Sequence, residues 1–322
     1  MKKIAILIVV LSLLCTCSKV RVQHFNGQAF GTLYSVSYIG LKDDSLKAKT
    51  DSLLSDLSSI FSIFDTNSAI FKFNNGEDIL LDNDFLYLTN LSKEVSRETE
   101  GAFDCTVQPL VQLWGFGKGG VRRIVPDDSL TDAKKHVGFH LVEVKNNQVL
   151  RLDSAVQLNF NAIAKGFAVD KLADFLESMG YSNCLVEIGG EIAARGDKNG
   201  KPWKVGIQVP CNDANGAQQS FNSFPLKHHR AVATSGNYRN YFEELGTRYT
   251  HILDPRTGKP EKTNLLSVSV VAPDCATADA FATAFMVLGF EKSSNIVKKN
   301  PNIEAWFIIA EDNNKWKVVE VR

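Results

Sequence analysis

The chain has 322 residues, of which 44% are hydrophobic and 10% aromatic, so it can bury a large core and is not a disordered protein. Its 36 Lys and Arg residues balance 36 Asp and Glu residues, which gives a formal net charge of +0 and argues against a nucleic-acid partner. Length alone permits one large domain or two lobes.

The first residues have the pattern of an export signal. Lys2 and Lys3 precede a continuous apolar run, Ile4–Leu14, which is too short to span a bilayer as a mature helix. We therefore expect the mature body to lie outside the cytoplasm.

A cysteine directly after that run resembles a bacterial lipoprotein signal, in which the cysteine becomes the lipidated N-terminus. Small Thr16 precedes Cys17, whereas bulky Leu14 precedes Cys15, so Cys17 is the favoured site. We expect residues 1–17 to be the signal peptide and residues 18–27 a tether. The protein would then be lipid-anchored in the cell envelope, facing the periplasm, and an ordinary secreted protein is the alternative.

Four cysteines remain in the body of the chain, and none forms a C-x-x-C pair, which disfavours a zinc site. Their spacing indicates no particular disulfide. Cys184 stands in an apolar run and is expected to be a buried thiol.

Hydrophobic periodicity predicts a mixture of helices and strands. Expected strands are Phe30–Ile39, Val156–Asn161, Leu185–Ile188, Trp203–Val209, Ala231–Gly236 and Leu265–Ala272. Expected helices are Asp44–Phe64, Asn83–Thr99, Lys165–Met179, Ala276–Leu288 and Glu291–Lys298. Leu141–Leu152 has the pattern of a hairpin, Asn212–Ser220 that of a loop, and Ile303–Ala310 with Trp316–Val321 that of an antiparallel pair. Without strict βαβ alternation, these elements favour an α+β fold.

Two segments have the composition of a pocket wall. The run AIAKG (162–166) joins an expected strand to a helix, an arrangement in which helix N–H groups can meet a phosphate. Lys165 would pair with that phosphate or be a solvated first-turn lysine. In GAFDCTVQPLVQLWGFGKGG (101–120), glycines and aromatics indicate a pocket wall or a core-packing crossover, and Trp114 and Phe116 fit the core better.

The segment YTHILDPRTGKP (249–260) holds a histidine, an aspartate and an arginine within six residues. Tyr249–Leu253 is predicted to be a strand that ends in a tight turn. His251 would then face a cleft, or it would be a surface histidine beside a structural turn.

Asp279 and Thr283 stand four residues apart in an apolar helical run, so both side chains lie on one face of the helix. One carboxylate and one hydroxyl suit Mg²⁺, whose shell substrate phosphates can complete. A hydrogen-bonded helix without a metal is the alternative.

Taken in order, these motifs resemble those of the ApbE family, the FAD:protein FMN transferases, from about Phe30 to the C-terminus. The motifs are FGT (30–32), FSIFDTNSAIFKFN (61–74), GAFDCTVQPLVQLWGFG (101–117), AIAKGFAVD (162–170), EIGGEIAARG (187–196), TSGNYRNYF (234–242), YTHILDPRTGKP (249–260) and ADAFATAFMVLG (278–289). The resemblance implies a T-fold-like α+β architecture over residues 28–322, with mixed or antiparallel sheets and packed helices in a single compact body with two lobes.

The resemblance also implies a reaction. FAD is the substrate, its pyrophosphate is cleaved with Mg²⁺, FMN passes to a Ser or Thr hydroxyl of a partner protein, and AMP leaves. The implied partners are flavoprotein subunits of membrane redox complexes with an acceptor segment of the Ser/Thr-Gly-Ala-Thr type. An Mg²⁺-dependent FAD pyrophosphatase and a non-catalytic FAD-binding lipoprotein are the alternatives.

By the same resemblance, FAD contacts fall on Phe30, Phe64, Ala102, Phe103, Asp104, Asn159, Lys165 and Leu253. The metal ligands fall on the Ala162 carbonyl, Asp279 and Thr283. Asn159 replaces a usual Asp, Phe64 a usual Tyr, Phe30 a usual Met and Cys105 a usual Pro. We assign His251 as the candidate base and Asp254 as the residue that orients it or balances its charge.

Overall fold

An antiparallel sheet runs through the centre of the fold. The computed structural model describes residues 21–77, 79–117, 119–208, 220–226, 229–237, 241–244, 247–312 and 315–322. The eight strands of the sheet, in spatial order, are β1 (Arg21–Ala29), β2 (Thr32–Gly40), β5 (Cys184–Ile188), β6 (Glu191–Arg195), β9 (Arg230–Gly236), β14 (Leu265–Ala272), β15 (Glu304–Ala310) and β16 (Trp316–Val321). Every neighbouring pair is antiparallel.

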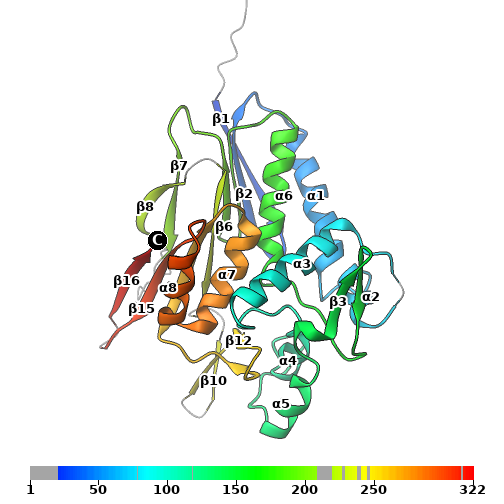
Figure 1. Ribbon diagram of the computed structural model, residues 1–322. Coiled ribbons are helices and arrows are strands. Elements are labelled where there is room, and N and C mark those ends of the chain that lie inside the picture. Colours follow the sequence, from blue (N-terminus) through cyan, green and yellow to red (C-terminus); the bar gives the residue numbers. More distant parts are fainter. Residues whose placement is uncertain are drawn as a thin grey trace, which may run out of the picture.

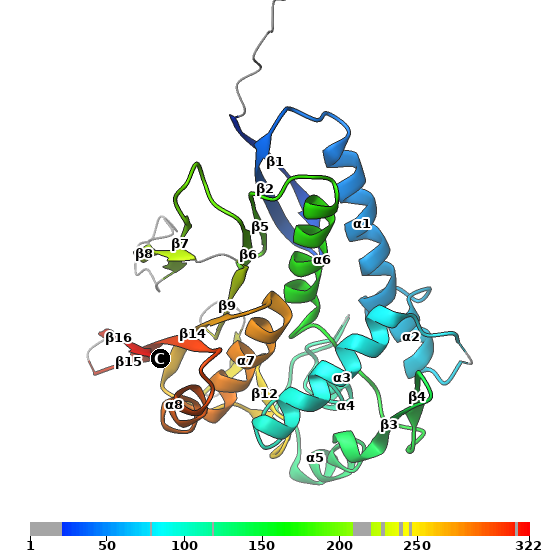
Figure 2. The ribbon, with the colours of Figure 1, turned by 45° about the horizontal axis from the view of Figure 1, so that its top comes forward.

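Helices pack on one face of this sheet (Figure 1 and Figure 2). They are α1 (Leu46–Phe61), α6 (Ala164–Ser178), α7 (Cys275–Leu288) and α8 (Phe290–Lys299), and α3 (Asn83–Glu98) packs on α7. The main core between the two layers contains fully buried aromatics such as Phe85, Phe160, Phe285 and Phe307. The alanine-rich α7 is apolar on nearly all sides, which is why it can lie at the centre of this layer.

Smaller elements complete the structure. The β7–β8 hairpin (Trp203–Gln208 and Ser220–Leu226) packs a second core against the other face of the sheet, around Trp203 and Trp306. The remaining elements are α2 (Ala69–Asn74), α4 (Gln108–Leu113), α5 (Asp127–Lys134), the 3₁₀ turn η1 (Phe139–Leu141), β3 (Val142–Lys145), β4 (Gln148–Arg151), β10 (Tyr241–Glu244), β11 (Thr247–Thr250), β12 (Leu253–Asp254) and β13 (Lys259–Pro260). Within the described ranges, no helix has the length and apolar character needed to cross a bilayer.

The position of α7 is set by contacts with α6. Both oxygens of Asp170, a buried residue of α6, accept hydrogen bonds at the start of α7, from Cys275 N (2.8 Å) and Ala276 N (2.9 Å). A carboxylate there satisfies two N–H groups that a helix leaves unpaired and complements the helix dipole. Gly166 permits the close crossing, because an added Cβ would lie 2.4 Å from the Cys275 carbonyl oxygen and 2.8 Å from Asp279 Cβ.

Most predicted elements are confirmed, with small shifts at their ends. The predicted helices correspond to α1, α3, α6, α7 and α8, and the C-terminal pair corresponds to β15 and β16. The hairpin at Leu141–Leu152 is confirmed as β3 and β4, joined by Asn146 and Asn147 with φ of 52° and 58°. Cys184 is a buried free thiol, as expected.

The strand predicted at Val156–Asn161 is wrong. Its backbone is paired mainly with groups outside any sheet: Leu158 exchanges two hydrogen bonds with the Asn74 side chain (2.7 and 2.8 Å), and Asn159 N donates to the Cys105 carbonyl (2.7 Å). The sheet-like contact that remains is an isolated bridge between Gln157 and Val107. The apolar run is therefore apolar because its side chains are buried, and not because it pairs in a sheet.

Two other predictions differ from the structure, and a third lies almost wholly outside the described residues. Residues 21–27, expected in the tether, lie in β1, because each pairs with a residue of β2. The strand expected at Tyr249–Leu253 is interrupted at His251 and Ile252: β11 pairs with β10, whereas β12 pairs with β13. The loop expected at Asn212–Ser220 lies outside the described residues except for Ser220, which begins β8; Val209 and residues 1–20 are outside them as well.

We predict that Asp170→Ala lowers the free energy of unfolding by about 2–4 kcal/mol, because two buried N–H groups lose their acceptor. Burial raises the pKa of Asp170 to about 7, from an ordinary value of 3.8, although the two backbone hydrogen bonds oppose this shift. The stability linked to its protonation is therefore complete below the unfolded pKa and lost as the pH rises through the folded pKa.

Denaturant unfolding of both proteins should accordingly show a larger gap at about pH 5 than at about pH 8. Asp56→Ala, at an exposed position of α1, is the control for loss of a helical carboxylate and should change stability much less. An equal or widening gap at the higher pH would contradict the prediction.

Candidate active site

A cavity of about 610 Å³ opens between the sheet, the start of α6, the middle of α7 and the segment around His251. All but two of the predicted site residues line it: Phe64, Ala102, Phe103, Asp104, Asn159, Ala162, Lys165, His251, Leu253, Asp279 and Thr283. The exceptions among the described residues are Phe30, which lies in the β1–β2 turn, and Asp254. Segments from residue 64 to residue 283 thus meet in one place.

One wall of the cavity carries a group of charges whose two carboxylates, Glu191 and Asp279, are buried. Lys165 Nζ lies 2.7 Å from Glu191 Oε1, and the Glu191 side chain is only 3% exposed. Burial works to lower the pKa of Lys165, but nearby Asp279 and Glu191 outweigh it and raise that pKa. Lys165 is therefore a permanent cation at neutral pH.

Asp279 lies across from this lysine on α7. Burial raises the pKa of its carboxyl, and the ammonium of Lys165 works against that rise. Asp279 Oδ2 accepts a hydrogen bond from Gly166 N (3.1 Å), which ties the carboxylate to the start of α6. A further cation in the cavity would favour the ionised form of this acid.

The predicted metal ligands are all oxygen donors. Thr283 lies one helical turn beyond Asp279 and shares a hydrogen bond with Ser235 Oγ on β9 (3.1 Å). Buried Glu191 Oε2, next to them on the cavity wall, has no hydrogen-bond partner. In the part of the chain that the structure describes, no three His, Cys, Asp or Glu side chains form a metal cluster.

This donor set fits Mg²⁺ and fits a transition metal poorly. Mg²⁺ takes hard oxygen ligands and uses few carboxylates when substrate phosphates complete its shell. The Ala162 carbonyl, Asp279 and Thr283 would hold it.

A second region of the cavity is polar but rigid. Asp104 accepts from both the backbone N (2.8 Å) and the hydroxyl (2.7 Å) of Thr106, and burial raises the pKa of Asp104. Asn159 donates to Gln108 Oε1 (2.7 Å), and its own Oδ1 accepts from Asn161 N (2.9 Å). These bonds fix the direction of each side chain before a ligand arrives.

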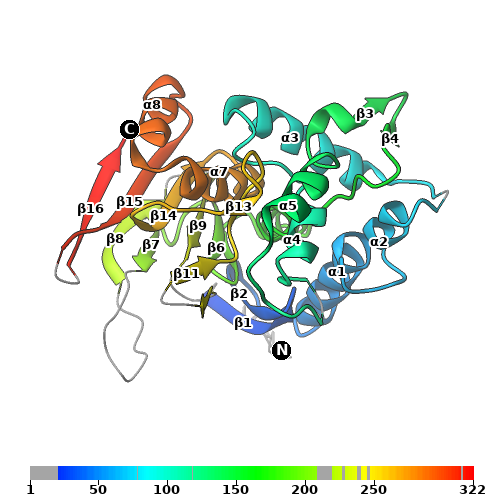
Figure 3. The ribbon, with the colours of Figure 1, turned by 90° about the horizontal axis from the view of Figure 1, so that it is seen from below.

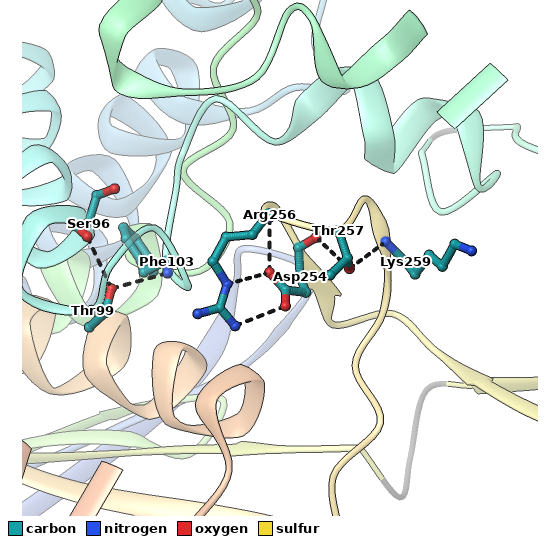
Figure 4. A network of polar contacts seen from close by, with 7 residues as sticks. All are labelled: Ser96, Thr99, Phe103, Asp254, Arg256, Thr257 and Lys259. Atoms are coloured by element: carbon teal, nitrogen blue, oxygen red, sulfur yellow. Dashed lines mark hydrogen bonds and ion pairs between the residues drawn. The ribbon is translucent and has the colours of Figure 1, made fainter. Parts of the chain in front are cut away.

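The segment after His251 is held by a fork of hydrogen bonds, shown in Figure 4. Asp254 Oδ1 and Oδ2 accept from Arg256 Nε and Nη2, both at 2.9 Å. The stem of Arg256 reaches the Gly101 turn, where an added Cβ would lie 3.6 Å from Arg256 Cγ. Asp254 therefore balances the charge of Arg256 and holds its side chain beside the Gly101 turn; its predicted action on His251 stays a prediction.

Sequence reasoning passed over two residues of this site, Glu191 and Ser235. Both stand inside motifs noted above, EIGGEIAARG and TSGNYRNYF. The signal for Glu191 was its place directly after Gly189 and Gly190, which form a tight turn with φ of 65° and 111° between β5 and β6. A strand that starts after such a turn presents its first side chain at the edge of the sheet.

Comparison with known proteins gives a consistent picture. The sequence model of the ApbE family matches residues 30–307 of this chain. An FAD:protein FMN transferase from Vibrio cholerae serotype O1 is 36% identical over 300 residues, which cover 90% of this chain and 89% of its own. An FAD:protein FMN transferase from Haemophilus influenzae is 35% identical over 319 residues, which cover 93% of this chain and 90% of the relative.

Solved structures agree with the α+β fold. The flavin transferase ApbE from Vibrio cholerae superposes with a TM-score of 0.83 at 32% identity, covering 94% of this chain and 97% of its own. The apo form of Pseudomonas stutzeri flavinyl transferase ApbE also has a TM-score of 0.83 at 32% identity. The match covers 94% of this chain and 95% of the Pseudomonas stutzeri chain. With its motifs in order, its fold matched and its cavity built from the residues those motifs carry, this chain belongs to the ApbE family.

Proposed function

We propose that this protein is an enzyme that transfers FMN from FAD to a Ser or Thr hydroxyl of a partner protein, with Mg²⁺, and releases AMP. Its named relatives are FAD:protein FMN transferases. The observation that carries the proposal is the cavity, which brings a lysine cation, a carboxylate–hydroxyl pair and a histidine together.

Binding of FAD would use the two ends of the cavity differently. Phe64, which is 42% exposed, and buried Phe103 offer flat apolar surface for ring systems. Lys165 and the nearby start of α6 offer positive potential for the pyrophosphate.

Phosphoryl transfer needs positioning and charge neutralisation more than covalent work by the protein. The acceptor hydroxyl oxygen forms a bond to the phosphorus of the FMN half, and the bridging P–O bond breaks. The bridging oxygen leaves as part of AMP, and the hydroxyl proton passes to His251. Lys165 stabilises the negative charge that remains on the phosphates.

The chain's own residues prepare the site for the metal. Bound Mg²⁺ would neutralise phosphate charge and polarise the phosphoryl group. Asp279 and Thr283 would hold it from one face of α7, the helix that Asp170 and Gly166 fix in place.

The location of the reaction is part of this proposal. Residues 1–17 would direct export, and a lipid on Cys17 would anchor the protein to the membrane, facing the periplasm. Subunits of membrane redox complexes with a Ser/Thr-Gly-Ala-Thr type segment would be the acceptors.

The decisive experiment uses the soluble protein, FAD, Mg²⁺ and an acceptor domain that carries a motif ending in Gly-Ala-Thr. We expect the acceptor to gain flavin fluorescence that survives denaturing electrophoresis, with release of AMP and dependence on Mg²⁺. Release of AMP that is faster than labelling and independent of acceptor would instead indicate an FAD pyrophosphatase. FAD recovered intact would indicate a binding protein.

We predict that Asp279→Ala abolishes transfer while FAD binding weakens less, because the carboxylate holds the metal and only indirectly the flavin. Initial rates and flavin titration measure the two effects separately. Asp274→Ala is the matched control: it removes a carboxylate from the N-cap of the same helix, outside the cavity lining, and should cost stability by about 1 kcal/mol but retain transfer. Normal turnover by Asp279→Ala without divalent metal would refute the metal assignment.

We predict that His251→Ala lowers the transfer rate by about 10²–10⁴-fold, as expected when a general base is removed. FAD affinity should change little. His24→Ala, at an exposed position of β1 that does not line the cavity, controls for loss of an imidazole and should have no effect. A loss of only a few-fold for His251→Ala would make the histidine a structural residue.

A further inference from the structure

A basic loop continues from the cavity wall to the surface. Phe116 lines the cavity, and the Arg122 guanidinium carbon lies 5.7 Å from the centre of its ring. Arg122 and the next residue, Arg123, are both exposed. We call residues 115–124, in their described part, the rim loop.

The rim loop has no regular secondary structure, yet the fold holds it in place. An added Cβ on Gly115 would lie 2.2 Å from the Val121 carbonyl oxygen, so the start of the loop is in contact with the backbone at Val121. Directly after the loop, Val125 is buried with Leu110 and Trp114 in a separate small core. The rim loop is therefore a preformed surface.

Its exposed side chains are unusual for a surface without a partner. Val121 is 80% exposed and Ile124 is 40% exposed, on either side of the two arginines. The sequence from Gly115 to Pro126 contains no acidic residue. The nearest acid on α5, Asp127, is paired with Lys259 (2.9 Å), and Asp128 follows it. An acidic and partly apolar partner would complement this surface.

Trp114, the residue directly before the rim loop, contacts the segment that carries His251. Trp114 Nε1 donates to the Gly258 carbonyl (2.8 Å), and its ring lies 5.8 Å from that of Tyr249. Figure 3 shows α4 and α5 beside β13, in agreement with these contacts. The rim loop therefore begins next to the segment that carries His251, and Phe116 and His251 line the same cavity.

We propose that the rim loop is the docking surface for the acceptor protein, and that it binds an acidic, partly apolar segment next to the target hydroxyl. The inference rests on the proposed function, because any acceptor hydroxyl must cross the mouth of the cavity to reach the base. Arg122 and Arg123 are not among the residues that line the cavity, so FAD is the poorer candidate for their charges.

The test uses the full soluble protein and two forms of one acceptor domain, with either acidic or neutral residues flanking its Gly-Ala-Thr segment. For the wild type, KM should be lower for the acidic form, and added salt should remove the advantage. The double variant Arg122→Glu with Arg123→Glu should raise KM for the acidic form about tenfold, which corresponds to about 1.4 kcal/mol. KM for the neutral form and half-saturation by FAD should stay unchanged.

Lys298→Glu with Lys299→Glu, at the end of α8, makes the same change of charge elsewhere and should leave every value unchanged. A second variant, Val121→Ser with Ile124→Ser, should raise KM for both acceptor forms by a few-fold.

Three results would overturn the inference. One is equal KM for both acceptor forms in the Arg122/Arg123 variant and the wild type. Another is that FAD binding by this variant weakens as much as its KM for the acidic acceptor rises. The third is that the variant loses only the ability to bind phosphatidylserine vesicles. A wild type that labels neither acceptor form refutes the proposed function itself, and the docking inference with it.

Discussion

The arrangement of this protein depends on the carboxylate of Asp170, which accepts hydrogen bonds from the first two backbone N–H groups of α7. That contact fixes where α7 begins, and the helix then carries Asp279 and Thr283 to the cavity. Gly166, four residues before Asp170 on α6, lets the two helices approach until its own N–H reaches Asp279. A short stretch of α6 therefore places Asp279 and Thr283 at the cavity.

The same crossing explains why charge is concentrated at this wall. Lys165 follows the turn that brings α6 to the cavity, and it meets both Glu191 and Asp279. Buried charges are costly unless they are paired, and here the carboxylates outnumber the cation, with one Glu191 oxygen left unpaired. A site with this excess of negative charge is better suited to bind a cation together with its ligand than to stabilise the fold when no ligand is bound.

Sequence reasoning succeeded where local patterns decide structure and failed where distant groups do. The helices and the hairpin around Asn146 follow from periodicity and turn chemistry, and the family motifs brought nearly all site residues to one cavity. The segment at Val156–Asn161 looked like a strand because it is buried, but a side chain far along the chain, Asn74, takes its hydrogen bonds. The break at His251 depends on β11 and β12 having different partners, which no local pattern reveals.

The pairing of β2 with β5 has a consequence for how the chain folds. Tyr38 lies opposite Cys184, and the residues between these strands contain helices α1 to α6 and the cavity-lining residues from Phe64 to Lys165. Closing so long a segment is entropically expensive, and contacts between residues distant in sequence slow the search for the native state. Until it closes, both strands present open edges that invite association with other chains. The chain would thus be most vulnerable to aggregation in the interval before β5 reaches β2.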